Sequence, residues 1–128
     1  MRLEGSEEIV RAICSDKYDG DRISPSAFTG ANVSVSRLSI IGLEDQWEVL
    51  KKSVQKPPQR MLKLLAQCSV ATVEEVGKVS NPPAELRVDA AAEVENPAHA
   101  EIRPQVTRGQ GNRLKELVTI HELPDDRA

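Results

Sequence analysis

Aromatic residues are nearly absent from this sequence, in which Phe, Tyr and Trp occur once each among 128 residues. The core must therefore be built from Leu, Ile, Val and Ala, which bury less area per side chain than aromatic rings do. We expect moderate stability, or support from a partner subunit. A chain of this length forms one compact core and is too short for two ordinary domains. We expect one domain over residues 1–123 and a disordered tail at 124–128.

Cysteines and long apolar runs are also scarce. Cys14 and Cys68 lie far apart without a CxxC pattern, which favours buried thiols in a cytosolic chain over a disulfide in a secreted one. Residues 1–8 are acidic where a signal peptide needs an apolar run. No stretch approaches the roughly 20 apolar residues that span a bilayer. We therefore expect a cytoplasmic protein that does not bind membranes.

Basic residues are not in excess either, because the formal net charge is −3. That balance argues against a general binder of the nucleic-acid backbone, and few aromatic residues are present for base stacking. A local basic patch is still allowed. The spacing of the two cysteines and two histidines matches no common metal-ligand pattern. No GxSxG elbow marks a serine nucleophile, and we expect no metal and no other cofactor.

Helical and strand patterns alternate along the chain. Apolar residues from Leu43 to Val54 recur at intervals of four, three and four, which predicts a helix. Further helices are expected at 6–16, at 72–78 and from a start between 107 and 112 up to Pro124, with a single helical turn at 24–28. Strands are expected near residues 33, 64, 86 and 100. The pattern predicts an α+β fold, with a small, mostly antiparallel sheet of about four strands and three or four helices.

The segment 96–102 places one of the two histidines between alanines. In a strand, His99 and Glu101 point to one face and the two alanines beside His99 point to the other. A histidine next to a carboxylate can act as a general acid or base. His99 and Glu101 are therefore candidate catalytic residues, and Asn96 is a candidate ligand-binding residue. The same pattern also fits a histidine hydrogen-bonded to the backbone at a sheet edge.

The run from 103 to 113 carries three arginines and two glycines and leads into the last expected helix. Free N–H groups at a helix start, glycines that admit an anion and guanidinium forks would together form a phosphate or carboxylate cradle. A solvated loop is the alternative, because the glycines lack both the GxGxxG context and a P-loop. The candidate ligand-binding residues here are Arg103, Arg108, Gly109, Gly111 and Arg113.

Three segments carry a resemblance to known sequences. Ser-Pro-Ser-Ala-Phe at 24–28, Val-Ser-Val-Ser-Arg at 33–37 and Asn-Pro-Ala-His-Ala at 96–100 resemble a pattern found in small uncharacterised bacterial proteins. The resemblance covers about a third of the chain and implies no activity. It favours a bacterial cytosolic protein in which residues 96–100 matter.

Two classes of function fit these observations. The favoured one is a non-catalytic protein-interaction module that binds itself or an operon partner, because no catalytic constellation is complete and strand edges invite pairing. The alternative is an enzyme or sensor for a phosphate-bearing ligand, such as a nucleotide or an RNA end. In that case the arginines at 103, 108 and 113 would hold the anion and His99 would act as acid or base. His99 beside two of these arginines in a concave pocket would favour the alternative.

Overall fold

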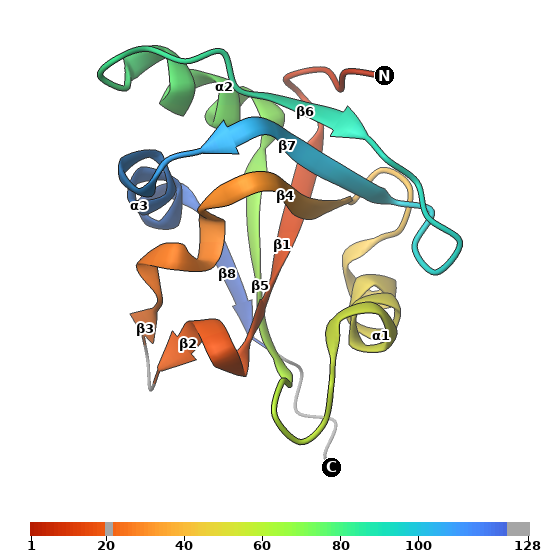
Figure 1. Ribbon diagram of the computed structural model, residues 1–128. Coiled ribbons are helices and arrows are strands. Elements are labelled where there is room, and N and C mark those ends of the chain that lie inside the picture. The colour runs from red at the N-terminus through yellow and green to blue at the C-terminus, as the bar shows by residue number, and fades with distance from the viewer. Residues whose placement is uncertain (20–21, 123–128) are drawn as a thin grey trace.

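The computed structural model describes residues 1–19 and 22–122, and it centres on a six-stranded antiparallel sheet (Figure 1). The strands lie in the order β6-β7-β4-β1-β5-β8. A separate two-stranded ribbon pairs β2 with β3. The α+β class and the mostly antiparallel sheet are confirmed, but the described residues contain more strands than the four expected. The strands are β1 (Glu8–Cys14), β2 (Tyr18–Asp19), β3 (Arg22–Ile23), β4 (Gly30–Arg37), β5 (Leu62–Ser69), β6 (Arg87–Ala90), β7 (His99–Val106) and β8 (Thr119–Glu122).

Helices cover both faces of the sheet. On one face, α1 (Leu43–Val54) packs against β1 and β5 through a small cluster around Trp47 and Leu65. On the other face, α2 (Val70–Val79) and α3 (Arg108–Leu117) enclose the larger cluster, together with the 3₁₀ turn η2 (Pro25–Phe28). A second 3₁₀ turn, η1 (Ser15–Lys17), follows β1. None of the helices within the described residues is long and apolar enough to cross a membrane.

The helix expected over residues 6–16 is wrong, because this segment forms β1. Ile9 and Ile13 enter the larger cluster while Val10 and Cys14 enter the smaller one. A strand buried on both faces places apolar residues side by side in the sequence, and over so few residues this spacing also matches a helical stripe. The β-branched residues of this segment favour the strand.

The end of the chain also differs from expectation. The last helix begins at Arg108, within the expected interval, but it ends at Leu117 and is followed by β8. His121 therefore lies in a strand, where its Nε2 is 2.7 Å from Oε1 of Gln67. Residues Val118 to Ile120 are β-branched, which favours the extended conformation. The expected tail at 124–128 lies outside the described residues.

The strand expected near residue 100 is β7, which begins at His99 and continues through Pro104 to Val106. A proline is tolerated here because the pairing of β7 with β4 shifts register between Ala31 and Val33, opposite this position. Asn32 takes a left-handed φ of 53° in the same irregularity. Beyond Arg103, β7 has no partner on β6, so the proline removes no donor needed on that side.

Several expected elements are confirmed. The helix over 43–54 appears at its expected bounds. The turn at 24–28 forms with Ser24 as N-cap and Pro25 in its first positions. The extended segment near residue 64 is β5, and the helix after it begins at Val70, capped by Ser69 where Thr72 was expected to start it.

The pairing of β1 with β4 is short. Ile9 pairs with Arg37 and Val10 with Ser36, and no further pair joins these two neighbouring strands. The rest of β1 pairs only with β5, on its other side. The sheet is therefore open between β1 and β4, on the side towards the C-terminal end of α1, and this gap positions the candidate site.

Candidate functional site

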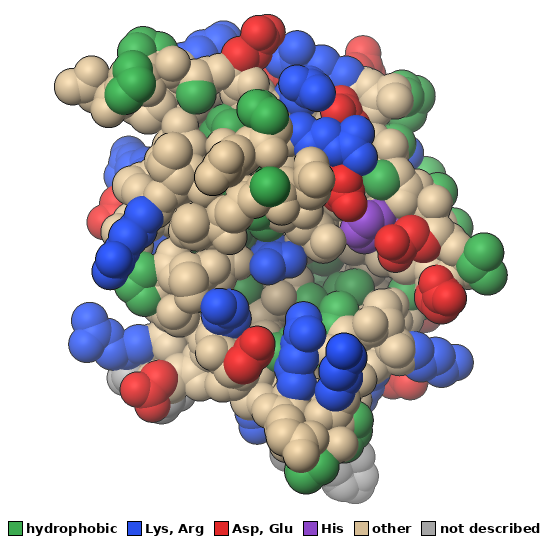
Figure 2. Space-filling model, viewed as in Figure 1, with side chains coloured by type: hydrophobic (Ala, Val, Ile, Leu, Met, Phe, Trp, Pro, Cys, Tyr) green, Lys and Arg blue, Asp and Glu red, His purple; other side chains and the backbone are tan. Residues whose placement is uncertain are grey.

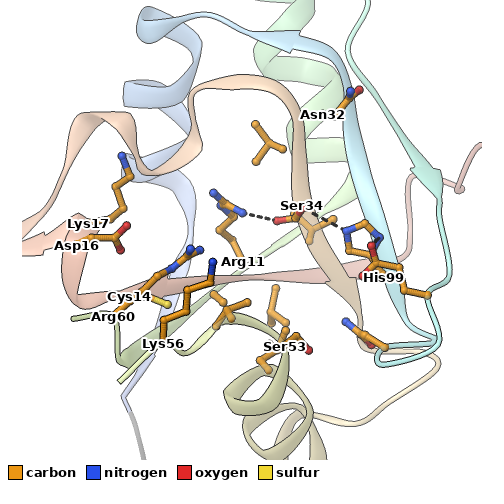
Figure 3. Close-up of a pocket in the computed structure, with 18 of the residues that line it drawn as sticks. Arg11, Cys14, Asp16, Lys17, Asn32, Ser34, Ser53, Lys56, Arg60 and His99 are labelled. Carbon is orange, nitrogen blue, oxygen red and sulfur yellow. Dashed lines mark hydrogen bonds and ion pairs between the residues drawn. The ribbon is translucent and has the colours of Figure 1, made fainter. Parts of the chain in front are cut away.

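A cavity of about 480 Å³ occupies the gap between β1 and β4 (Figure 3). Its walls come from β1, η1, β4, the end of α1, the start of β7 and the connections at 55–61 and 91–98. Pockets of roughly 300–1,000 Å³ hold small organic ligands, so the volume suits a molecule of that size. Figure 2 shows the hollow on the surface, with apolar side chains in its depth and with basic side chains, a histidine and some acidic side chains around it.

Four basic side chains from separate segments line this cavity: Arg11 on β1, Lys17 on η1, and Lys56 and Arg60 in the connection after α1. Figure 3 shows the Lys56 and Arg60 side chains reaching towards the Arg11 head group. None of the four forms an ion pair with a carboxylate among residues 1–19 and 22–122. The Nε atom of Arg60 is buried and has no hydrogen-bond partner within the described part of the chain. We call these four residues the cation cluster.

Arg11 is the innermost member of the cation cluster. Its Nε donates to the backbone oxygen of Ala27 at 2.9 Å, and its Nη1 donates to the backbone oxygen of Ser34 at 2.8 Å. Both acceptors are neutral, so they satisfy hydrogen bonds without balancing the charge. Burial lowers the pKa of Arg11, and the neighbouring charge of Arg60 lowers it further. An anion bound here would offset both effects.

Cys14 lies beside Arg60 in the cavity wall. Burial raises the pKa of the Cys14 thiol, and the hydrogen bond and charge of Arg60 do not fully offset that effect. Because the thiolate is the reactive form, a thiol with a raised pKa is a poor nucleophile at neutral pH. Cys14 therefore contributes an apolar wall and no covalent chemistry.

His99 lines the opposite end of the cavity. Its Nδ1 is 2.8 Å from the backbone oxygen of Ala91, and its Nε2 is 3.2 Å from Oγ of Ser34. The carboxylates of Glu93 and Glu101 lie 3.7 Å from Nδ1 and 4.0 Å from Nε2. The ring is thus held by two hydrogen bonds, with only 8% of the residue exposed.

His99 and Glu101 share one face of β7, as strand alternation predicts. The alanines on either side of His99 are fully buried, and Ala100 belongs to the larger core cluster. The arrangement combines the two interpretations of the sequence: His99 is hydrogen-bonded to a backbone carbonyl, and it also faces a concave site. Of the two candidate catalytic residues, only His99 lines the cavity.

Asn96 lines the cavity but uses its amide to hold the 91–98 connection in place. Its Nδ2 donates to Oγ of Ser36 at 3.2 Å, and its Oδ1 accepts the N–H of Ala98 at 3.0 Å. The Ser36 hydroxyl in turn donates to Oε1 of Gln46 at 2.7 Å. With 2% of Asn96 exposed, the buried side chain fixes the end of the connection that leads into His99.

The candidate cradle at 103–113 is not a loop. Arg103 lies in β7, where its Nη2 is 2.6 Å from Oε1 of Glu101 and its Nη1 is 3.4 Å from Oδ2 of Asp89. The other four candidate residues, Arg108, Gly109, Gly111 and Arg113, lie in α3.

None of these five candidates lines the cavity beside His99. Thr107 and Gln110 form a capping box that occupies the backbone N–H groups of these two residues at the start of α3. Arg113 pairs with Glu116 at 3.1 Å. Gly111 packs closely, since a Cβ at this position would lie 2.6 Å from Oγ1 of Thr29. The condition set for the phosphate alternative, His99 beside two of these arginines in a concave pocket, is therefore not met; the basic residues that line the cavity with His99 are different ones.

No local pattern in the sequence indicates the cation cluster or singles out Ser34. Each basic residue belongs to a different local pattern, and Arg11 lies in the segment that was expected to be a helix. Ser34 and His99 are 65 positions apart. Only tertiary structure brings these side chains together.

Comparison with known protein families, with curated proteins and with solved structures finds no match to this chain. Function must therefore be argued from the geometry and chemistry of the cavity itself.

Proposed function

We propose that this protein binds a small phosphate-bearing ligand in the cavity between β1 and β4. The observation that carries the proposal is the cation cluster, which surrounds a concave site and has no carboxylate partner among the described residues. Other basic side chains of the protein, such as Arg37 and Arg103, are paired with acidic neighbours. Some basic residues elsewhere, such as Lys52 and Arg108, also have no ion pair among the described residues, but they are exposed and do not line this cavity.

Electrostatics favour an anion at this place. Like charges brought together in a partly buried site repel one another, and the repulsion exceeds that between charges in bulk water. Guanidinium groups bind phosphate and carboxylate oxygens through paired N–H donors, and lysines add further charge. A ligand with two or more negative charges would therefore relieve the repulsion between Arg11 and Arg60 and gain hydrogen bonds.

The apolar part of the cavity favours an organic ligand over a bare anion. Val10, Val33, Val35, Leu50 and Val54 all contribute to its lining. Burial of the apolar part of a ligand against this lining removes it from water and so favours binding. A nucleoside monophosphate combines a dianionic group with a body of suitable size, and we choose AMP as the probe.

The proposal is tested by isothermal titration calorimetry with AMP, with adenosine as the uncharged counterpart. We expect AMP to bind at least about tenfold more tightly than adenosine, and the difference to shrink with added salt. Lys56→Gln and Arg60→Gln should each weaken AMP binding by about tenfold. Lys52→Gln is the matched control, since Lys52 is exposed at the end of α1 and does not line the cavity. Equal losses in all three variants, or no AMP binding at millimolar concentration, would contradict the proposal.

A protein-interaction role is our second candidate, and the edge of the sheet at β8 favours it. At the opposite edge, the N-terminal residues cover β6 through hydrogen bonds of Leu3 N to Val88 O and of Ala90 N to Met1 O, both 2.8 Å. At the β8 edge, Leu117 and Ile120 are each 41% exposed. We propose a second copy of the chain as the partner there. Light scattering that shows a dimer disrupted by Ile120→Lys would support this role, and a strict monomer would exclude it.

A further inference from the structure

We infer that Ser34 and His99 form a nucleophile and general-base pair, which cleaves a carboxylic ester in a substrate that also carries an anionic group. The inference rests on the proposed function, because the cation cluster would hold that anionic group. Both side chains line the cavity, and Figure 3 shows them next to each other, joined by a dashed line.

The hydrogen bonds of His99 fix which ring nitrogen carries the proton. A backbone carbonyl can only accept, so Nδ1 donates to Ala91 across the 2.8 Å contact. In the neutral ring, Nε2 is then unprotonated and accepts from the Ser34 hydroxyl, which lies 3.2 Å away. A hydroxyl hydrogen-bonded to an imidazole that is itself oriented by a third group is the arrangement that activates a serine nucleophile.

Two carboxylates lie beside the ring of His99, which takes the serine proton in the first step. Glu93 lies 3.7 Å from Nδ1 and Glu101 lies 4.0 Å from Nε2. These carboxylates come from the 91–98 connection and from β7, so they approach the ring from two elements. They would stabilise the imidazolium without accepting its proton, as the orienting carboxylate does in serine hydrolases.

Arg11 adds a positive charge next to the nucleophile. Its Nη1 is 2.8 Å from the backbone oxygen of Ser34, and its remaining N–H groups have no partner among the described residues. Preorganised donors beside the reacting carbonyl stabilise the oxyanion of the tetrahedral intermediate. Lys56 and Arg60 would then hold the permanent anion of the substrate, with Arg11 between the two groups.

The reaction balances without a further reagent. Oγ of Ser34 attacks the ester carbonyl carbon, and its proton passes to Nε2 of His99. The tetrahedral intermediate expels the alcohol oxygen, which takes the proton from Nε2, and an acyl group remains on Ser34. Water then attacks the acyl group, gives a proton to His99 and releases the carboxylic acid, and the proton returns to Oγ.

An acyl group fits this geometry better than a phosphoryl group as the unit transferred. In acyl transfer, the alcohol leaves a tetrahedral carbon from a position close to the attacking oxygen, so one base can serve both proton transfers. In phosphoryl transfer, the leaving oxygen departs in line, opposite the nucleophile. A single His99 beside Ser34 could not reach a leaving group on that far side.

The test compares two esters of equal acyl length, 4-nitrophenyl hydrogen succinate and 4-nitrophenyl butyrate. We expect the anionic succinate ester to react with a kcat/KM at least about tenfold higher, and Lys56→Gln to remove most of that preference. Ser34→Ala and His99→Gln should lower kcat/KM by about 100-fold or more. Ser34 is exposed on its strand, so its truncation leaves the fold intact even if the histidine variant does not fold. Lys52→Gln should leave both esters unaffected.

Two readouts separate failure of this inference from failure of the proposed function. Ser34→Ala should keep its affinity for AMP, and acid-quenched wild-type protein should carry the succinyl group on Ser34 by peptide mass spectrometry. AMP binding with no ester cleavage above the buffer rate, or cleavage unchanged in Ser34→Ala, would overturn the inference and leave the proposed function standing. Ester cleavage that depends on Ser34, without AMP binding, would contradict phosphate binding and leave the assignment of the Ser34–His99 pair standing. Hydrolysis of 4-nitrophenyl phosphate in place of both esters would overturn the acyl assignment.

Discussion

The guanidinium of Arg11 on β1 donates a 2.8 Å hydrogen bond to the backbone oxygen of Ser34 on β4. At this level the two strands share no backbone pair, because their pairing ends at Val10 and Ser36. One side chain therefore bridges the gap in the sheet and also forms the inner wall of the cavity. The stability of this region and its affinity for anions depend on the same residue.

We expect Arg11→Met to destabilise the protein by about 2–3 kcal/mol, because two backbone carbonyls lose a charged donor. Arg11→Lys should recover only part of this loss, since one ammonium cannot reproduce the fork that reaches Ala27 and Ser34. Urea unfolding measures the change. Arg108→Met, at an exposed position of α3, is the control and should change stability by less than about 0.5 kcal/mol. Equal effects of Arg11→Met and Arg108→Met would show that Arg11 does not bridge the strands.

The two glycines of α3 should respond oppositely to alanine. A Cβ on Gly109 meets open space, so Gly109→Ala should be neutral or stabilise by up to about 1 kcal/mol through helix propensity. A Cβ on Gly111 would lie 2.6 Å from Oγ1 of Thr29 and 3.4 Å from the backbone of Phe28. Gly111→Ala should therefore cost about 1–3 kcal/mol, as thermal unfolding of the pair will show. Similar melting temperatures for the two variants would mean that α3 does not pack on η2 at this distance.

Stability should fall in acid partly through Glu7. The two hydrogen bonds from Arg37 lower the pKa of Glu7, and the Ser39 hydroxyl lowers it further. A carboxyl whose pKa is lower in the folded state stabilises the protein above its unfolded-state pKa, and this contribution is lost as pH falls through the folded-state pKa. Glu7→Gln should cost about 1 kcal/mol at neutral pH, and the cost should vanish once the pH has fallen below the lowered folded-state pKa of Glu7. Glu4→Gln, at an exposed position, serves as control; a Glu7→Gln deficit that stays constant with pH would rule out this linkage.

Neither thiol should react in the folded protein near neutral pH. Burial and the charge of Glu8 raise the pKa of Cys68 to about 12, and burial raises the pKa of Cys14. A thiol reagent at pH 7.5 should therefore modify both residues only after urea unfolding. Rapid labelling of Cys14 in native protein would contradict its assignment as an inert wall of the cavity.

The parts of the fold that sequence predicts well are those fixed by local pattern. From Leu43 to Val54, one apolar stripe continues over three turns and ends before a Pro-Pro pair, so α1 appears at its expected bounds. The apolar residues of β1 span fewer positions and lie on both faces of the strand. Whether such a segment forms a helix or a strand depends on which neighbours cover each face. Sequence alone does not show that α1 covers one face and η2 with α3 the other.

The candidate site likewise has one part that local sequence pattern predicts and another that it does not. Strand alternation places His99 and Glu101 on one face without reference to the rest of the chain. The partners of His99 do not follow from local pattern, because Ser34 and the basic residues at 11 and 60 reach the cavity from distant segments. The arginines at 103–113 are close to His99 in the sequence, yet β7 and the capped helix α3 direct them away from the cavity.

The most direct test of the central claim is an NMR titration of the ¹⁵N-labelled protein with AMP. If the cavity binds phosphate, amide shifts should concentrate in residues 10–17, 31–35 and 53–60, and Arg11 Nε should lose intensity or shift. Arg60→Gln should reduce these changes, and adenosine should not produce the shifts near Arg11. Shifts centred instead on α3 near Arg108 and Arg113, or no saturable shifts at all, would contradict the assignment of this cavity as the anion site.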